Sequence, residues 1–139
     1  MKYDMPSSDA ENVLISHETY RRIAQFNHDR NWDQFHTPKD MAISISLEAA
    51  ELLECFQWSG PDMQVDQKKD KIVEETADIM IYALQLCQVL QIDPEAIIRK
   101  KIEQNELKYP ADKAYGRALK YTELHQLPEQ DDCPDGIDT

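Results

Sequence analysis

Hydrophobic residues recur every three or four positions between residue 16 and residue 107, a spacing typical of amphipathic α-helices. The pattern predicts four helices, at about 16–29, 38–58, 66–91 and 94–107. Thr37-Pro38 and Asp93-Pro94 each place an N-cap residue before a proline, which favours a helix start at both points. Because no strand pattern competes, the sequence predicts an all-α fold similar to a four-helix bundle.

The helix predicted at 66–91 is apolar on nearly every side between residues 79 and 90. A helix of this kind is buried between neighbouring helices or in a subunit interface. We therefore expect the chain to form a homo-oligomer, assembled as a dimer of dimers. An aromatic-rich connector at 31–36 joins the first two helices.

The chain has 139 residues and a formal net charge of −12. This length suits one compact domain. We place the domain at 15–124, between a flexible polar arm at 1–14 and a flexible acidic tail at 125–139. The negative charge argues against a nucleic acid polymer or an anionic membrane as partner. No apolar run approaches the roughly 18 residues that span a bilayer, and no secretory leader opens the chain.

The cysteine and glycine residues indicate the redox state of the thiols and exclude two kinds of phosphate-binding loop. Three cysteines form no CxxC pair and leave an odd count, which indicates reduced thiols and a cytoplasmic protein. With only three glycines, the chain has neither a Walker A loop nor a GxGxxG turn. If phosphate is bound, metal ions and cationic side chains must hold it.

Two acidic pairs with (i, i+3) spacing stand on the apolar faces of neighbouring helices. Glu48 and Glu51 flank the apolar stripe of the second helix. Glu75 lies inside the stripe of the third helix, with Asp78 at its edge. The short loop between these helices predicts antiparallel packing. Glu51 with Glu75, and Glu48 with Asp78, share the sequence midpoint 63, which puts all four carboxylates at one level.

Four ionised carboxylates in a low-dielectric groove repel one another, and each carries a desolvation cost of several kcal/mol. They would take up protons or bind a hard cation through oxygen. Because no His or Cys joins them, Mg²⁺ is favoured over zinc. Glu54 is expected at the surface, and Glu74 lies about 100° from Glu75 on the helix, outside the cluster.

Several sequence blocks in addition to the acidic pairs resemble one known family. They occur in order from about residue 20 to residue 124, as "RNWDQFHTPKD", "EAAELLECFQW", "EETADIMIYAL", "KIEQNELKYP" and "KYTEL". The chain resembles the all-α nucleoside triphosphate pyrophosphohydrolases of the MazG-like superfamily, and within it the dCTP-pyrophosphatase-type branch. The resemblance implies hydrolysis of a (deoxy)nucleoside triphosphate, with a dCTP-like substrate preferred, to the monophosphate and pyrophosphate. The implied role is nucleotide pool sanitation or dNTP balance.

The resemblance also implies roles for individual residues. The metal ligands and catalytic residues would be Glu48, Glu51, Glu75 and Asp78, holding Mg²⁺, for which Mn²⁺ could substitute. The base and sugar would contact Trp32, His36, Trp58 and Tyr82, and the nucleotide or its phosphates Lys101, Asn105 and Tyr109. Departures from the family pattern occur at Leu47 and Ala50, where glycine is common, and at Ile23, where a polar base contact is expected.

Taken from the residues alone, other interpretations stay open. Trp32 and Trp58 could stack on a base or simply cover the core at helix ends. The basic residues of 101–120 could face solvent. The acidic flank could belong to a non-catalytic helical interaction or regulatory module that binds a basic partner. A redox di-metal bundle expects Glu-x-x-His pairs, which the chain lacks.

Overall fold

The computed structural model describes residues 15–58, 68–124 and 126, and all regular structure within them is helical. The elements are α1 (His17–His28), the 3₁₀ helix η1 (Asp33–Phe35), α2 (Pro38–Glu54), α3 (Lys69–Leu90), α4 (Pro94–Lys108), α5 (Ala111–Ala114) and α6 (Tyr121–Leu124). The predicted all-α fold is confirmed. The predicted arm at 1–14 and nearly all of the tail at 125–139 lie outside the described residues.

Side-chain caps start the first two long helices where the sequence predicts them. The Ser16 hydroxyl accepts a hydrogen bond from the Thr19 backbone N–H at 3.1 Å. The Thr37 hydroxyl accepts one from the Asp40 N–H at 3.2 Å, and Pro38 fills the first helical position. These bonds satisfy backbone donors that have no partner inside the helix.

The predicted end of α2 was too late by four residues. The helix ends at Glu54, and the chain continues through a turn to Trp58, whose φ of 66° is left-handed. The short helices α5 and α6 were not predicted either. Each has four residues, about one turn, which is too short for a hydrophobic period to be visible in the sequence.

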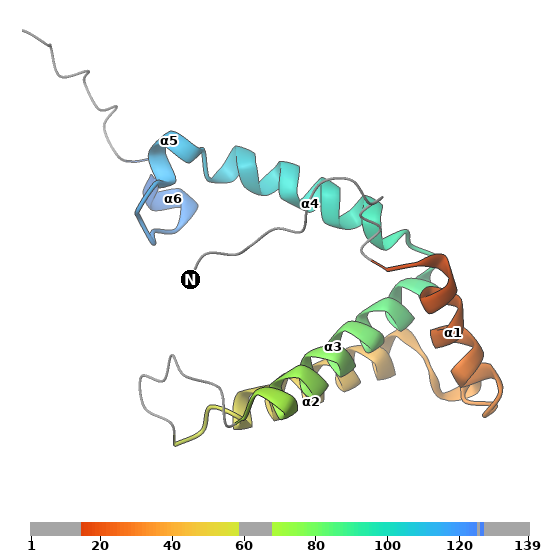
Figure 1. Cartoon of the computed structure of the whole chain (residues 1–139). Helices are drawn as coiled ribbons and strands as arrows, with labels where there is room; N and C mark the ends of the chain where they lie inside the picture. Colours follow the sequence, from red (N-terminus) through yellow and green to blue (C-terminus); the bar gives the residue numbers. More distant parts are fainter. Residues whose placement is uncertain (1–14, 59–67, 125, 127–139) are drawn as a thin grey trace, which may run out of the picture. The chain divides into compact units, whose positions relative to one another are not determined.

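The described chain divides into two compact units, one ending at Glu95 and the other beginning at Ala96. In the first unit, α2 and α3 lie side by side and antiparallel, and α1 contacts α3 (Figure 1). The Gln88 side-chain amide donates a hydrogen bond to the Tyr20 carbonyl at 2.8 Å, which ties α3 to α1. The Lys68 ammonium donates to the Cys55 carbonyl at 2.6 Å, which joins the chain just before α3 to the end of α2.

In the second unit, the end of α4 meets α6 through aromatic and cationic contacts. The rings of Tyr109 and Tyr121 pack edge to face with centroids 6.5 Å apart. The Lys108 ammonium lies 5.5 Å from the Tyr121 ring centroid. Leu124 of α6 is buried.

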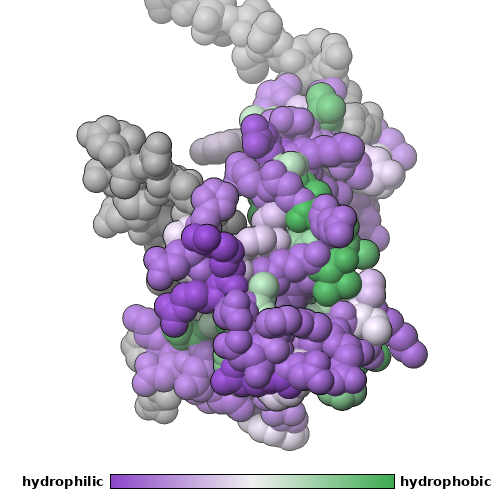
Figure 2. Space-filling model, turned by 90° about the vertical axis from the view of Figure 1, so that its right-hand side faces the viewer, coloured by the Kyte–Doolittle hydropathy of each residue, from purple (hydrophilic) through white to green (hydrophobic). Residues whose placement is uncertain are grey.

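Many large hydrophobic side chains stay exposed on the single chain. Figure 2 shows a face that is mostly hydrophilic, with hydrophobic side chains gathered among the hydrophilic ones. On α3 the exposed apolar residues include Val73, Met80, Ile81, Val89 and Leu90. Among the described residues, no helix has the length and apolar character needed to cross a membrane.

Candidate active site

Three acidic side chains from α2 and α3 come together. Glu48 and Glu51 of α2 and Glu75 of α3 each offer a carboxylate oxygen, and these oxygens all lie within 4.8 Å of one another. Glu75 is only 7% exposed, Glu48 is half-buried and Glu51 is exposed. The (i, i+3) spacing on α2 and the antiparallel pairing with α3 therefore bring together three of the four carboxylates that the sequence predicts.

The electrostatics of this acidic cluster (Glu48, Glu51 and Glu75) favour a positive ligand. Burial raises the pKa of Glu48, and the neighbouring charges of Glu51, Asp78 and Glu75 raise it further. A side-chain hydrogen bond with Glu75 acts in the same direction. The Lys71 ammonium lies 3.9 Å from a Glu75 oxygen and offsets part of the negative charge. Oxygen donors with excess negative charge suit a hard divalent cation, so the residues present fit Mg²⁺ or Mn²⁺.

Two further acidic residues of these helices, Glu54 and Glu74, stand where the helical wheel predicts, whereas Asp78 departs from its predicted place in the cluster. Glu54 and Glu74 are both exposed. Asp78, one turn after Glu75, is also exposed, and it acts on Glu48 through its charge. Asp78 therefore belongs to the electrostatic surroundings of the acidic cluster without joining the three oxygens that lie closest together.

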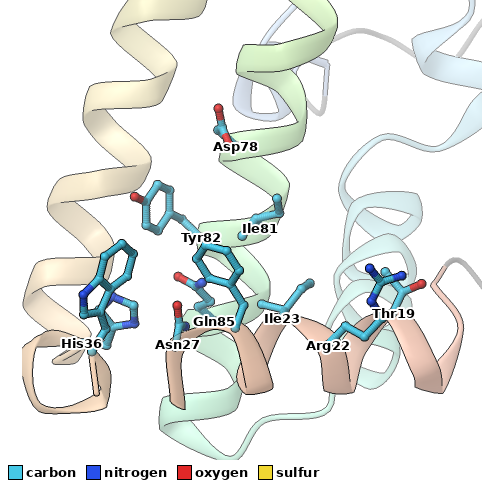
Figure 3. Close-up of a pocket in the computed structure, with 11 residues that line it drawn as sticks. Thr19, Arg22, Ile23, Asn27, His36, Asp78, Ile81, Tyr82 and Gln85 are labelled. Carbon is cyan, nitrogen blue, oxygen red and sulfur yellow. The ribbon is translucent and has the colours of Figure 1, made fainter. Parts of the chain in front are cut away.

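A pocket of about 380 Å³ opens between α1, the connector and α3 (Figure 3). Its lining includes three of the four residues that the family resemblance implies as base and sugar contacts, Trp32, His36 and Tyr82. Its other lining residues are Thr19, Arg22, Ile23, Phe26, Asn27, Asp78, Ile81 and Gln85. The volume and the mixture of aromatic and polar side chains are typical of a site for a small organic ligand.

Aromatic packing holds Trp32 at the pocket. Its ring meets Phe26 edge to face at a centroid distance of 5.9 Å and meets His36 at 6.5 Å. The Arg30 guanidinium lies 3.6 Å from the Phe26 ring centroid. The Trp32 backbone N–H donates to the Asn27 carbonyl at 3.0 Å, which fixes the connector against the end of α1.

The pocket adjoins the acidic cluster through Asp78. This residue lines the pocket, and its charge raises the pKa of Glu48. Asp78, Tyr82 and Gln85 are spaced at i, i+4 and i+7 on α3, so they share one face of the helix. Figure 3 shows them in that order down α3. A ligand in the pocket would therefore extend past Asp78 toward the carboxylates.

Several known proteins are similar to this chain. The sequence matches the MazG-like family over residues 43–124. The chain belongs to the MazG-like family. It is 35% identical to dCTP pyrophosphatase 1 of Mus musculus over 114 residues, covering 77% of this chain and 66% of that protein. It is 34% identical to dCTP pyrophosphatase 1 of Homo sapiens over 113 residues, with the same shares covered. The chain thus spans slightly less than two thirds of the length of these relatives.

A solved structure is similar to this MazG-like chain in both sequence and fold. It is a pyrophosphatase from Archaeoglobus fulgidus DSM 4304, with 40% sequence identity and a TM-score of 0.62. The similarity covers 78% of this chain and 99% of that one. The family match at 43–124 contains the acidic cluster and Tyr82, whereas Trp32 and His36 of the pocket precede it.

Four predicted substrate-binding residues, Trp58, Lys101, Asn105 and Tyr109, are not among the residues that line the pocket. Trp58 is 93% exposed and does not line the pocket. Lys101, Asn105 and Tyr109 belong to the second unit, where they are exposed, and the Tyr109 N–H donates to the Asn105 carbonyl at 2.8 Å. Their roles in binding the substrate stay predictions.

Two buried polar residues of the pocket, Asn27 and Gln85, are among the lining residues that were not singled out in the sequence. Asn27 is 4% exposed and Gln85 is 5% exposed, although both side chains are polar. Gln85 is a polar residue inside the apolar segment 79–90, seven positions after Asp78, and this spacing was the available signal. Asn27 carries no such signal, because its burial depends on the packing of α1 against α3.

Proposed function

We propose that this chain is a divalent-metal-dependent nucleoside triphosphate pyrophosphohydrolase, which converts a (deoxy)nucleoside triphosphate to the monophosphate and pyrophosphate. The observation that carries the proposal is the acidic cluster beside an aromatic pocket. Asp78 connects the two, because it lines the pocket and its charge raises the pKa of Glu48 in the cluster. MazG-like membership and the names of the similar dCTP pyrophosphatases and of the archaeal pyrophosphatase support it. A dCTP-like nucleotide is the expected substrate, and pool sanitation or dNTP balance is the expected role.

In this proposal the base enters the pocket and the phosphates reach the acidic cluster. Trp32 and His36 would stack against the base, and Tyr82 would contact the base or sugar. Asp78 lines the pocket and its charge raises the pKa of Glu48, so the phosphates that follow the sugar would pass near Asp78. In this proposal the triphosphate would run along α3.

The four carboxylates Glu48, Glu51, Glu75 and Asp78 would hold Mg²⁺, with Mn²⁺ as a substitute. The cation, when bound, would supply positive charge against the triphosphate. Glu48 or Glu51 would orient a water and accept its proton. The water oxygen then bonds to the α-phosphorus while the bridging bond from the α-phosphorus to the leaving oxygen breaks, and pyrophosphate leaves.

The second unit would supply phosphate contacts. Lys101 and Asn105 are four residues apart on α4 and therefore share a face, and Tyr109 follows after another four residues. An ammonium, an amide and a phenol on one face provide hydrogen-bond donors for phosphate oxygens. Trp58 would be a further contact of the base.

We further propose that residues 15–124 act as one four-helix-bundle-like domain within a homo-oligomer, a dimer of dimers. The exposed apolar residues of α3 support this assembly, because apolar patches of this kind mark protein interfaces. A cytoplasmic location is supported by Cys55 and Cys87, which are both free and buried. The net charge of −12 supports a small substrate over a nucleic acid polymer or an anionic membrane.

A product assay tests the proposed function. The purified chain is incubated with a panel of NTPs and dNTPs in Mg²⁺, Mn²⁺ or EDTA, and pyrophosphate and monophosphate are measured. We expect equal amounts of both products from at least one nucleotide with metal and none with EDTA. Failure to hydrolyse any nucleotide, or release of orthophosphate in place of pyrophosphate, would contradict the proposal.

A further inference from the structure

One buried polar atom in the pocket lacks a partner. The Gln85 side-chain oxygen, Oε1, is buried and has no hydrogen-bond partner among the described residues. Gln85 as a whole is 5% exposed. Leaving a buried acceptor unpaired costs free energy, and native proteins rarely keep one without a reason. A ligand that donates a hydrogen bond to Oε1 would remove this cost.

Gln85 stands where a ligand would meet it. It lines the pocket together with Asn27, which is also more than nine-tenths buried. In the view of Figure 3, the two amides fall between His36 on one side and Ile23 on the other, below Tyr82. Two buried amides therefore face a cavity whose other walls are largely aromatic and aliphatic.

The aromatic and the amide side chains of the pocket would contribute differently to binding a base. Aromatic rings such as Trp32 stack on every base, because every base has a π-face, so they give affinity without selection. A buried amide offers one acceptor and two donors in fixed directions. A site built to hydrogen-bond a substrate group strongly rejects the analogue that lacks it, since its own polar atoms are then left unpaired.

We propose that Gln85 determines base specificity by accepting a hydrogen bond at Oε1 from the exocyclic amino group of the base, as in cytosine or adenine. This inference rests on the proposed function, which places the base in the pocket. A keto base such as uracil or hypoxanthine carries a carbonyl oxygen at the same ring position. There two acceptors face each other, so the hydrogen bond is lost and the oxygens repel. Asn27 supplies a second amide for the adjoining ring nitrogen.

The test compares nucleotides that differ at this one position. The values of kcat/KM are measured for dCTP against dUTP and for dATP against dITP, and the pair whose ring size the enzyme accepts is used. We expect the wild-type chain to prefer the amino nucleotide by about tenfold or more, the scale set by one unpaired buried acceptor. In Gln85→Met the preference should fall to within about threefold of unity through loss on the amino substrate.

Two further variants separate specificity from a merely structural role. Gln85→Glu keeps an acceptor at the same place and should retain the preference for the amino base. Gln88→Met makes the same change one turn on, where the amide donates to the Tyr20 carbonyl and does not line the pocket. It should lower thermal stability and leave the substrate ratio unchanged.

The outcomes distinguish this inference from the function on which it rests. Turnover with a wild-type ratio near unity, a preference for the keto base, or a ratio that Gln85→Met leaves unchanged would overturn the role of Gln85 while the hydrolase function stands. If Gln85→Met does not fold, the wild-type ratio and Gln85→Glu still decide the matter. No turnover of any nucleotide by the wild-type chain would overturn both.

Discussion

Glu75 is 7% exposed although it carries a carboxylate. Its closest acidic neighbours, Glu48 and Glu51, add like charge within 4.8 Å, and the Lys71 ammonium at 3.9 Å offsets only part of it. Burying a charge without full compensation costs several kcal/mol. The acidic cluster therefore carries negative charge that is only partly compensated, and a bound cation would neutralise it. Binding of the cation should then stabilise the fold by mass action.

The change Glu75→Gln removes one charge from the acidic cluster and keeps its shape. Without metal, we expect the free energy of unfolding to be unchanged or higher, because repulsion with Glu48 falls. With metal, the rate of pyrophosphate release should fall at least about tenfold. Mutating even a residue that only hydrogen-bonds to a metal ligand typically lowers metal affinity or activity about 10- to 100-fold. The rise in melting temperature on adding Mg²⁺ should shrink as well.

The matched control for this prediction is Glu74→Gln. Glu74 precedes Glu75 on α3 and is exposed, so the same chemical change falls outside the acidic cluster. It should keep activity and Mg²⁺ stabilisation close to those of the unchanged chain. Full activity in Glu75→Gln would remove the acidic cluster from the proposed mechanism.

Trp32 should contribute affinity for the base by stacking. Trp32→Ala is expected to raise KM about 5- to 160-fold, which corresponds to about 1–3 kcal/mol of base stacking. Phe35→Ala serves as control, because Phe35 belongs to the same connector, is 62% exposed and does not line the pocket. Steady-state kinetics on the preferred nucleotide measure both. An equal KM in Trp32→Ala and the wild-type chain would place the base elsewhere.

At the scale of elements, the starts of helices were easier to predict than their ends. The Thr37 cap and Pro38 act through bonds within four residues, so the sequence marks the start of α2 directly. The end of α2 has no such local marker. The Lys68 ammonium binds the Cys55 carbonyl from 13 residues away, and a contact of this range is not visible as a pattern.

The acidic cluster and the pocket also differ in how far local sequence patterns predict them. The face on which Glu48 and Glu75 stand follows from helical spacing, and the antiparallel pairing follows from a short loop. The sequence therefore sufficed to bring Glu48, Glu51 and Glu75 together, whereas Asp78 stays outside these three closest oxygens. Asn27 and Gln85 become pocket residues only because α1 packs against α3, at a separation of 58 residues in the sequence. That contact depends on tertiary packing, which periodicity does not report.

The seam between α1 and α3 should respond to alkaline pH. Burial, and then the charge of Asp93, raises the pKa of the Cys87 thiol above its ordinary value of 9.0. Burial, followed by Cys87 and Asp93, raises the pKa of Tyr20 above 10.0. The folded chain thus holds these protons to higher pH than the unfolded chain. Because the unfolded chain binds fewer protons, the free energy of unfolding should fall as pH rises above about 9.

Urea unfolding between pH 7 and pH 11 measures this effect. Cys87→Ala should flatten the decline that begins near pH 9, while the part due to Tyr20, above pH 10, remains. The lost packing of the thiol lowers stability at every pH alike, so the slope is the quantity to compare. A slope just above pH 9 that is identical in the variant and the unchanged chain would contradict the prediction.

At the scale of the whole molecule, the charge of −12 opposes a polyanionic substrate. At physiological ionic strength, charges farther than about 8 Å apart are largely screened, so contact groups decide binding more than the total does. A triphosphate that arrives with its metal brings part of the compensation itself. The basic side chains of residues 101–120, in the second unit, would supply the rest. This division would let an acidic protein bind the acidic substrate of the proposed function.

Assembly is the remaining property of the whole molecule that the surface predicts. Val73 and Met80 are 58% and 44% exposed, and their spacing of seven residues puts them on one face of α3. Large apolar side chains on one helix face favour association, because contact removes them from water. Sedimentation velocity should therefore show a species larger than the 16.2 kDa chain.

The Val73→Lys, Met80→Lys double variant should shift this species toward the monomer, since association would bury two charges. Glu74→Lys adds a positive charge to an exposed polar position of α3 and should leave the assembly intact. A monomer at every concentration of the unchanged chain would contradict the prediction, and the exposed face of α3 would then need another partner.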